Sequence, residues 1–298
     1  MLITVFTPTY NRKTFLPILY DSLQKQTFQD FEWVIVDDGS SDNTIEYVKN
    51  IILQNKESKS SFTIRYYYQN NGGKHRAINH GVQKAKGELF FIVDSDDYLV
   101  DNSLEIIANT YFTIKNDKSF AGLGGLLMHS NGTIIGNMPI HSPLDCSQVD
   151  YWCKYRIHGD KTEVFRTDVL RDIPFPVYEG EKFCPEELEW LRISKKYQLR
   201  YINEVLAVRD YLEGGLTSKI VKLRMNNPRA SIYDYSYFNT FSIPFSRKVR
   251  NAVNYWRFRF CLPKDYRKRY IIPHLKWYWN WVMPLGWFFH LKDTKNVI

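Results

Sequence analysis

Cysteine is scarce in this chain, and none of its four cysteines has the spacing of a metal or redox site. They stand among 298 residues at positions 146, 153, 184 and 261, and no two of them form a CxxC pair. Unpatterned cysteines of this kind are typical of proteins that keep their thiols reduced. The cysteine count therefore predicts a cytoplasmic protein.

Three further patterns are missing. The opening residues MLITVFTPTY lack the basic leader of a signal peptide and predict a strand instead. The loop TPTYNR that follows contains no glycine, whereas a dehydrogenase needs GxGxxG there and a sugar-phosphate nucleotidyltransferase carries a Gly-rich loop. Residues 271–289 are aromatic and apolar but are interrupted by His274, Lys276, Asn280 and two prolines, which excludes a membrane-spanning helix of about 20 residues.

Acidic residues are nearly missing from the C-terminal part of the chain. Residues 219–298 contain 16 Lys and Arg but only three Asp and Glu, whereas residues 1–218 contain 24 and 29. The same C-terminal part holds five of the eight tryptophans. We therefore expect a slightly acidic body, residues 1–218, followed by a basic, aromatic and helical region, residues 219–298.

Strands and helices are expected to alternate over the first 114 residues. Short apolar runs predict strands at 2–6, 31–38, 62–69 and 88–94, and helical spacing predicts helices at 12–25, 41–54, 74–85 and 102–114. The first run is expected to end at Pro8. Such alternation implies an α/β fold of Rossmann-like type, with a mostly parallel sheet flanked by helices.

After residue 120 the expected elements are shorter. A hairpin is expected around Asn131 and Gly132, a helix at 186–197 and a strand at 200–211. We expect a boundary near residue 218, where the charge changes, and a C-terminal helical appendage beyond it.

An acidic stretch follows the fourth expected strand, in FFIVDSDD. Carboxylates one residue apart on a turn, such as Asp94 and Asp96, can share a divalent cation, and oxygen ligands favour Mg²⁺ or Mn²⁺. Such a cation removes the repulsion between the acids and holds a substrate diphosphate. The alternative is a solvated turn in which Asp97 or Asp101 caps the next helix.

Polar loops also follow the first three expected strands, as TPTYNR, DDGSSDNT and QNNGGKH. The carboxyl ends of parallel strands meet at one edge, where α/β folds bind ligands. Gly72 and Gly73 allow the backbone to approach a phosphate, and Lys74 adds positive charge near a helix N-terminus. The alternative for this loop is a flexible surface segment.

The motifs TPTYNR, VDDGSSDNT, GGKHRAINHGVQKAKGE and VDSDD, in this order and spacing, resemble the family 2 glycosyltransferases with the GT-A fold. The resemblance covers about residues 1–215. It implies a GT-A catalytic domain at 1–218, with a nucleotide-binding half at 1–100 and an acceptor half at 101–218. It also implies inverting transfer of a hexosyl or N-acetylhexosaminyl group from a nucleotide sugar, UDP-linked, to a hydroxyl, with Mn²⁺ or Mg²⁺ as cofactor.

The resemblance also assigns the donor site. DSDD matches the family's DxD motif, so Asp94 is expected to hold the ribose or sugar and Asp96 the metal. Asp38 matches the acid that accepts a hydrogen bond from uracil N3, with Asp37 as the less favoured partner. Tyr10 is expected to stack on the base, or else to cover the sheet. Five more residues complete the expected nucleotide-sugar site: Thr7, Pro8, Gly73, Lys74 and Ser95.

Inverting transfer needs a base for the acceptor hydroxyl, and the family supplies an acid downstream of DxD. Glu186 directly follows Pro185 at a predicted helix start and matches the Glu of an F-x-P-E stretch in a related subgroup. Its neighbour Glu187 is the alternative base or an acceptor contact. The alternative for Glu186 is that it only interacts favourably with the helix dipole. Asp160 and Lys161 resemble acceptor-side residues, or form a surface turn.

The sequence thus predicts a transferase that extends a surface glycan, as in capsule or lipopolysaccharide synthesis, or a lipid-linked oligosaccharide. The alternatives are a non-catalytic nucleotide-sugar-binding module and a nucleic-acid binder that uses the basic tail. Residues 247–269 interleave Arg and Lys with aromatic residues, which favours peripheral contact with an anionic membrane at its inner face. The alternative for this tail is packing on the catalytic domain or on a second subunit, as in a homo-oligomer.

Overall fold

The computed structural model describes residues 1–57, 62–210, 219–263 and 274–297, which fall into two compact units. Unit 1 comprises Met1–Pro174 and Ile193–Asp210, and unit 2 comprises Phe175–Arg192 and Tyr211–Ile298. The boundary expected near residue 218 lies outside the described residues. The expected half-domain at 101–218 differs from this division, because residues 175–192 group with the C-terminal helices.

Unit 1 is built on one nine-stranded sheet with the order β3-β2-β1-β4-β8-β6-β9-β5, and β7 lies beside β9. The first four strands in this order run parallel, as the alternation of strands and helices predicts. This parallel part is made by β1 (Ile3–Thr9), α1 (Leu16–Gln24), β2 (Phe31–Asp37), α2 (Thr44–Glu57), β3 (Thr63–Tyr68), α3 (Lys74–Lys84) and β4 (Leu89–Ile92).

The second part of the sheet is mixed. Strand β8 is antiparallel to both β4 and β6, whereas β6 and β9 are parallel. The expected turn at Asn131 and Gly132 forms. It follows Met128, the last residue of β6, and leads to Ile134, which makes a short antiparallel bridge with Met128. The elements are β5 (Tyr98–Leu99), α4 (Ser103–Phe112), β6 (Phe120–Met128), β7 (Leu144–Cys146), α5 (Gln148–Cys153), β8 (Lys161–Arg166), α6 (Thr167–Asp172) and β9 (Gln198–Val208).

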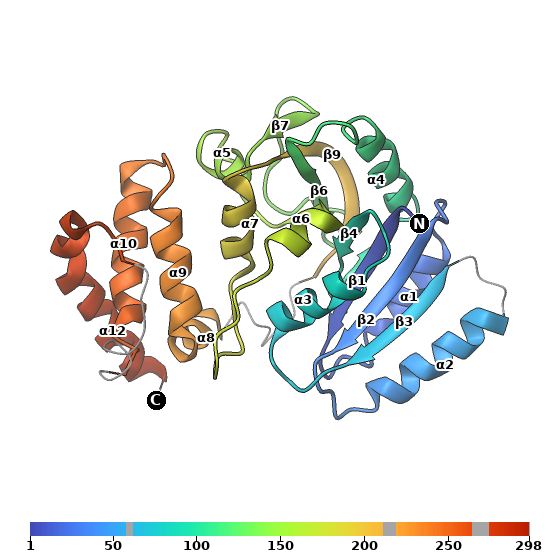
Figure 1. Cartoon of the computed structure of the whole chain (residues 1–298), viewed down its shortest axis with the longest axis horizontal. Helices are drawn as coiled ribbons and strands as arrows, with labels where there is room; N and C mark the ends of the chain where they lie inside the picture. Colours follow the sequence, from blue (N-terminus) through green and yellow to red (C-terminus); the bar gives the residue numbers. More distant parts are fainter. Residues whose placement is uncertain (58–61, 211–218, 264–273, 298) are drawn as a thin grey trace. The chain divides into compact units, whose positions relative to one another are not determined.

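Helices cover both faces of the parallel strands (Figure 1). On one face α1, α2 and α4 share a core with alternate strand residues such as Val5 and Trp33. Phe6, the next residue of β1, points to the opposite face and meets Gly81 of α3, where any side chain would overlap its ring. This close approach explains a glycine inside a helix and holds α3 directly over β1 and β2.

Strand β1 does not stop at Pro8, as expected, but continues through it to Thr9. The backbone N–H and C=O groups of even-numbered residues in β1 point towards β4: the carbonyl of Phe6, for example, accepts from the N–H of Val93. The backbone nitrogen of Pro8 therefore points to the same side. The ladder with β4 ends at Ile92, so the N–H that proline lacks has no strand partner on that side. Pro8 therefore still pairs in register with Val36 of β2.

Unit 2 is helical, which confirms the expected C-terminal appendage. Helix α10 packs between α9 and α12, with Ile232, Tyr255 and Phe258 in one core and Val253 and Trp279 in another. None of the described helices is long and apolar enough to cross a membrane. The helices are α7 (Glu186–Ser194), whose last two residues belong to unit 1, α8 (Ile220–Asn226), α9 (Pro228–Phe238), α10 (Phe245–Arg259), η2 (Trp277–Val282) and α12 (Met283–Val297).

Candidate functional site

The polar loops that follow β1, β2, β3 and β4 meet at one edge of the sheet. Thr9 lies opposite Asp37, and Asp37 lies opposite Tyr68, so the first three strands end level with one another. Asp94 comes just after β4, and the residue before it, Val93, still donates its N–H to the carbonyl of Phe6 in β1. The expected gathering of these motifs is therefore present in unit 1.

The loops after β1 and β2 are bonded to each other. The N–H of Asn11 donates to Ser40 Oγ at 2.9 Å, and Asn11 Oδ1 accepts from the N–H of Ser41 at 2.8 Å. The N–H of Lys13 donates to Asp42 Oδ2 at 3.1 Å. Tyr10, which directly precedes Asn11, is 50% exposed at this edge. The two loops form one platform.

Three other expected residues lie deeper. Thr7 is fully buried within β1, and its hydroxyl accepts a hydrogen bond from Trp33 Nε1 at 2.9 Å. The Thr7 side chain thus belongs to the core and supports the strand from inside. Pro8 is also buried. Ser95, the second residue of DSDD, is buried as well, with 5% of its surface exposed.

Asp38 organises the loop that follows β3. One carboxylate oxygen accepts from Gln69 Nε2 at 2.7 Å and from the N–H of Gly72 at 2.8 Å. The other accepts from Asn71 Nδ2 at 3.2 Å and from the N–H of Gly73 at 2.7 Å. A carboxylate has about four acceptor positions, so these four donors use its whole capacity. Asp38 is 5% exposed and fixes the glycine loop against β2.

The preceding acid is also engaged. Asp37 Oδ1 accepts from the N–H of Ser40 at 2.7 Å, and Oδ2 accepts from the Tyr66 hydroxyl at 2.8 Å. Burial, and then the bond to Asp37, raise the pKa of Tyr66. Gly39 has φ +87°, and a side chain there would meet the backbone nitrogen of Asn71 at 2.8 Å. Asp37 and Gly39 therefore shape the turn.

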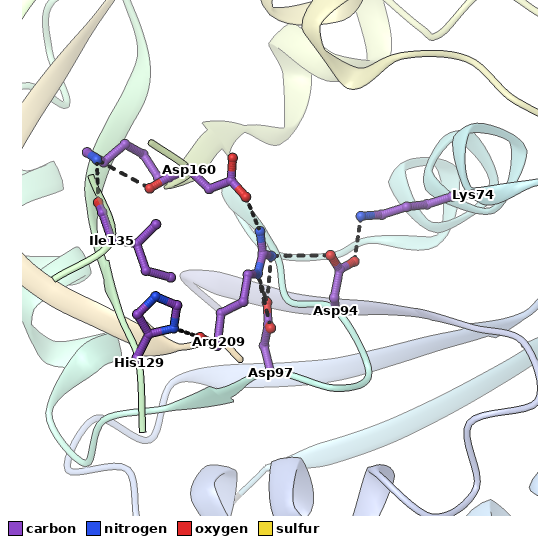
Figure 2. Close-up of polar contacts among 8 residues, drawn as sticks. Lys74, Asp94, Asp97, His129, Ile135, Asp160 and Arg209 are labelled. Atoms are coloured by element: carbon purple, nitrogen blue, oxygen red, sulfur yellow. Dashed lines mark hydrogen bonds and ion pairs between the residues drawn. The ribbon is translucent and has the colours of Figure 1, made fainter. Parts of the chain in front are cut away.

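Gly73 and Lys74 begin α3. Gly73 has φ 97°, a backbone conformation that favours glycine, and it serves as the N-cap residue. Lys74 Nζ lies 2.5 Å from Asp94 Oδ1 (Figure 2). Burial alone would raise the pKa of Asp94, but the charges of Lys74 and Arg209 lower it below its ordinary value. Asp94 is therefore an ionised carboxylate held between two cations.

Arg209, just after β9, is the centre of a charge cluster that the sequence did not predict. Its guanidinium donates to both oxygens of Asp97, at 2.6 to 3.1 Å, and to Asp94 Oδ2 at 3.2 Å. A third acid, Asp160, lies 3.6 Å away (Figure 2). Burial raises the pKa of Asp97 to about 6 against the opposing charge of Arg209. Three aspartates thus converge on one arginine.

Asp96 differs from these acids. It is half-buried, and its carboxylate makes no hydrogen bond or ion pair with any residue that the structure describes. The described residues contain no group of three or more His, Cys, Asp or Glu that would form an all-protein metal cage. One available carboxylate fits Mg²⁺ or Mn²⁺ in sites that substrate phosphates complete.

Asp160 and Lys161 have different positions. Asp160 is 53% exposed, whereas Lys161 is 8% exposed and is not on a surface turn. Lys161 Nζ donates to the backbone carbonyls of Ile135 at 3.1 Å and of His158 at 3.3 Å. Burial lowers the pKa of Lys161. Lys161 therefore ties β8 to neighbouring loops, and Asp160 is the member of the pair that faces solvent.

Glu186 and Glu187 open α7 as expected, and they belong to unit 2. Glu186 is half-buried. Glu187 lies 4.0 Å from Arg224 and 3.8 Å from Arg247. Burial and the charge of Asp234 raise the pKa of Glu187 to about 7, although both arginines oppose this shift. Glu187 is therefore a carboxylate that titrates near neutral pH.

Comparison with known proteins finds a family match over part of the chain. Residues 4–118 match the model of glycosyl transferase family 2. Glycosyltransferase GlyG of Streptococcus pneumoniae is 38% identical over 107 residues, which are 36% of this chain and 34% of that protein. A GalNAc(5)-diNAcBac-PP-undecaprenol beta-1,3-glucosyltransferase of Campylobacter jejuni is 26% identical over 211 residues, 69% of this chain and 63% of that protein. The matches thus span about a third to two thirds of these relatives.

The fold is also shared with a solved structure. Staphylococcus aureus TarS 1–349 in complex with UDP-GlcNAc superposes with a TM-score of 0.59 at 19% identity, over 99% of this chain and 89% of that one. A similarity at this level shows the fold, which is GT-A-like with a helical C-terminal region. Residues 4–118 of this chain are therefore similar to glycosyl transferase family 2, and the chain has a GT-A-like fold.

Proposed function

We propose that this chain transfers a hexosyl or N-acetylhexosaminyl group, with inversion, from a UDP-sugar to a hydroxyl. The observation that carries the proposal is the edge of unit 1. There an available carboxylate, Asp96, lies beside the Lys74–Asp94 pair and the glycine loop held by Asp38. Such a group of residues suits a diphosphate, because Lys74 and the N-terminus of α3 favour negative charge and a cation held by Asp96 would add to this.

In the proposed site Asp96 holds Mn²⁺ or Mg²⁺ together with the donor diphosphate. The cation, when bound, neutralises charge that develops on the departing diphosphate. Lys74 contributes positive charge at the same place from the N-terminus of α3. Asp94 keeps Lys74 and Arg209 in position, and one of its oxygens turns to the ribose or sugar when the donor enters.

For the nucleotide, Tyr10 stacks on the base and the backbone around Thr7, Pro8, Gly73 and Ser95 lines the site. Asp38 remains our candidate partner for uracil N3. Its four acceptor positions are occupied in the structure, so one loop donor has to yield when uracil binds. Asp38 then couples base recognition to the glycine loop.

For the acceptor hydroxyl, we keep Glu186 as the base and Glu187 as the alternative. A carboxylate with a pKa near 7 is a suitable base at neutral pH, which supports Glu187. Asp160, exposed and beside Arg209, is the proposed acceptor contact, with Lys161 in a supporting position.

The proposed acceptor is a surface glycan, as in capsule or lipopolysaccharide synthesis, or a lipid-linked oligosaccharide; the Campylobacter relative's name specifies a polyprenyl-linked substrate. The protein would then work in the cytoplasm, at the inner face of the plasma membrane. Exposed aromatic side chains in unit 2, such as Trp277 and Trp281, support peripheral contact with anionic lipid. The alternative partner of this surface is a second subunit.

A panel of UDP-, GDP- and dTDP-sugars with Mn²⁺, assayed by release of nucleoside diphosphate, tests the proposal. We expect UDP release from at least one UDP-sugar, slowly in water and faster with a hydroxyl acceptor. UDP-sugar binding without any release would favour the non-catalytic module. Release only from GDP- or dTDP-sugars would remove the assignment of Asp38 to uracil.

A further inference from the structure

Unit 2 contains a pocket of its own, whose lining includes Glu187, the alternative base above. Its volume is about 650 Å³, within the range of about 300–1,000 Å³ that is usual for small-molecule sites. Its walls come mainly from α10, with one or two residues each from α7, α9 and α12. All the lining residues belong to unit 2.

One side of the pocket is rich in hydrogen-bond donors from a single face of α10. Arg247, Arg250, Asn254 and Arg257 are three, four and three residues apart, which places them along one helix face. Arg257 is held by Asp293, at 2.8 Å from Nη2 to Oδ1. Its Nη1 also donates to Asn254 Oδ1 at 3.3 Å.

Two donors on this side have no partner among the residues that the structure describes. Arg250 is exposed and makes no ion pair or hydrogen bond with any described residue. Asn251 also lines the pocket and is only 3% exposed. Its Nδ2 group is buried without a hydrogen-bond acceptor among the described residues. Buried amides are almost always bonded, so an unsatisfied one in a pocket wall points to a ligand that supplies the acceptor.

The charges around the pocket favour an anion. Three arginines line it, and Glu187 is the acid in the lining. Asp293 offsets Arg257, and Glu187 lies 3.8 Å from Arg247. Arg250 is left as the uncompensated cation. A phosphate oxygen can accept from Arg250 and Asn251 together, because phosphate offers several strong acceptors.

The rest of the lining is apolar. Val253 and Phe289 line the pocket together with Leu285, which is 46% exposed. On the same helix Trp287 and Phe288 are 46% and 59% exposed. A pocket with a donor-rich side and an apolar side that continues into an exposed apolar surface matches an amphiphile better than a fully polar ligand.

We propose that this pocket of unit 2 binds the phosphate end of an amphiphile, a phosphate or diphosphate carried on an apolar chain. Arg250 and Asn251 bind the phosphate, and Val253, Leu285 and Phe289 contact the first carbons of the chain. The inference does not rest on the proposed sugar transfer, since binding is measured without a nucleotide sugar.

Calorimetric titration of the full chain with dodecyl phosphate, below its micelle concentration, tests the pocket. Inorganic phosphate and dodecyl maltoside serve as controls for the head and the tail. We expect one site, with dodecyl phosphate bound about tenfold or more tightly than either control. Arg250→Gln should weaken binding about tenfold through the lost charge-assisted bond. Lys292→Gln, an exposed cation of α12 outside the pocket, should change binding less than about twofold.

Three results would overturn the proposal. The first is no saturable binding of dodecyl phosphate by the wild-type chain. The second is equal affinity for inorganic phosphate, which would indicate a free-phosphate site. The third is equal weakening by Arg250→Gln and Lys292→Gln, which would indicate attraction by the general positive charge of this region.

Discussion

Asp94 and Asp96 stand one residue apart but have different surroundings. Asp94 lies 2.5 Å from Lys74 and 3.2 Å from Arg209, whereas Asp96 has no partner among the described residues. A carboxylate between two cations is already compensated, and one without a partner is available to a metal ion. We therefore propose that Asp96 holds the metal and that Asp94 positions the two cations.

At the same scale, Asp38→Asn should destabilise the protein as well as weaken UDP binding. Asparagine places an NH₂ group where two donors now point, so about two of the four hydrogen bonds to Asp38 are lost. Hydrogen bonds to charged groups contribute about 1.5–3 kcal/mol each, so a loss of about 3 kcal/mol or more in the free energy of unfolding is expected. Urea unfolding without nucleotide measures it.

The control is Asp101→Asn, which changes an exposed aspartate beyond the DSDD turn. It should leave the unfolding curve in place. Unchanged stability of Asp38→Asn, with UDP binding lost, would show that Asp38 serves the base alone and does not hold the glycine loop.

The base is tested by a matched pair, Glu186→Gln and Glu187→Gln. We expect Glu186→Gln to lower kcat about 10²–10⁴-fold, the usual effect of losing a general base, with donor binding retained. Normal kcat in this variant would transfer the role to Glu187. In that case kcat/KM of the wild type should rise as pH increases through about 7, because only the ionised Glu187 carboxylate accepts a proton.

At the scale of elements, α7 carries an acid that makes stability depend on pH. Glu189 is fully buried, and burial raises its pKa to about 7 although Arg192 donates to it at 2.8 Å. A raised pKa means that the folded state holds the proton more tightly than the unfolded chain does. The protonated Glu189 carboxyl therefore makes its full contribution to the free energy of unfolding below pH 4.5, the ordinary pKa of glutamate. This contribution is lost as pH rises through about 7.

We therefore expect the free energy of unfolding of the wild type to fall between pH 5 and pH 8 by more than that of Glu189→Gln. Since one pKa unit corresponds to about 1.4 kcal/mol, the difference is on the order of 3 kcal/mol. Urea unfolding at four pH values compares the two proteins. Parallel pH profiles would show that Glu189 is ionised in the folded state.

Most elements of the parallel half could be predicted from apolar periodicity, and the deviations have local causes. Helix α1 begins at Leu16 and not at residue 12. Asn11 has φ 53°, and its N–H and that of Lys13 donate to side chains of the neighbouring loop. Such cross-loop bonds depend on the assembled sheet, so no local sequence pattern contains them.

At the scale of the whole molecule, the strand-end motifs could be predicted because parallel strands bring their carboxyl ends to one edge. Arg209 could not, because it is 112 residues from Asp97 and reaches it through the path of β9 across the sheet. The grouping of residues 175–192 with unit 2 was missed for a similar reason. It depends on bonds such as those from the N–H groups of Arg229 and Ala230 to Glu181.

The basic, aromatic part of the chain should bind anionic vesicles. Residues 264–269 of the expected basic stretch lie outside the described residues, but Trp277 and Trp281 are 80% and 63% exposed. The full chain should co-sediment with anionic vesicles, less so at high salt. Trp277→Ser with Trp281→Ser should weaken binding by well over tenfold, since burial of each large apolar side chain contributes about 1.5–3 kcal/mol.

Phe112→Ser is the control, because Phe112 is 57% exposed in unit 1. It should sediment like the wild type. A wild-type chain that ignores anionic vesicles at low salt would leave packing on a second subunit as the role of this surface. Truncation near residue 218 is a poor test, because it removes the partners of residues 175–192.

Donor turnover by Asp96→Asn tests most directly whether the DSDD edge performs metal-dependent transfer. The variant keeps the size of the side chain and breaks no bond to a described residue. For Asp96→Asn we expect an unchanged unfolding curve. In the presence of Mn²⁺ its UDP release should fall to background, while Asp101→Asn keeps wild-type turnover. Full Mn²⁺-dependent turnover by Asp96→Asn would contradict this account of the site.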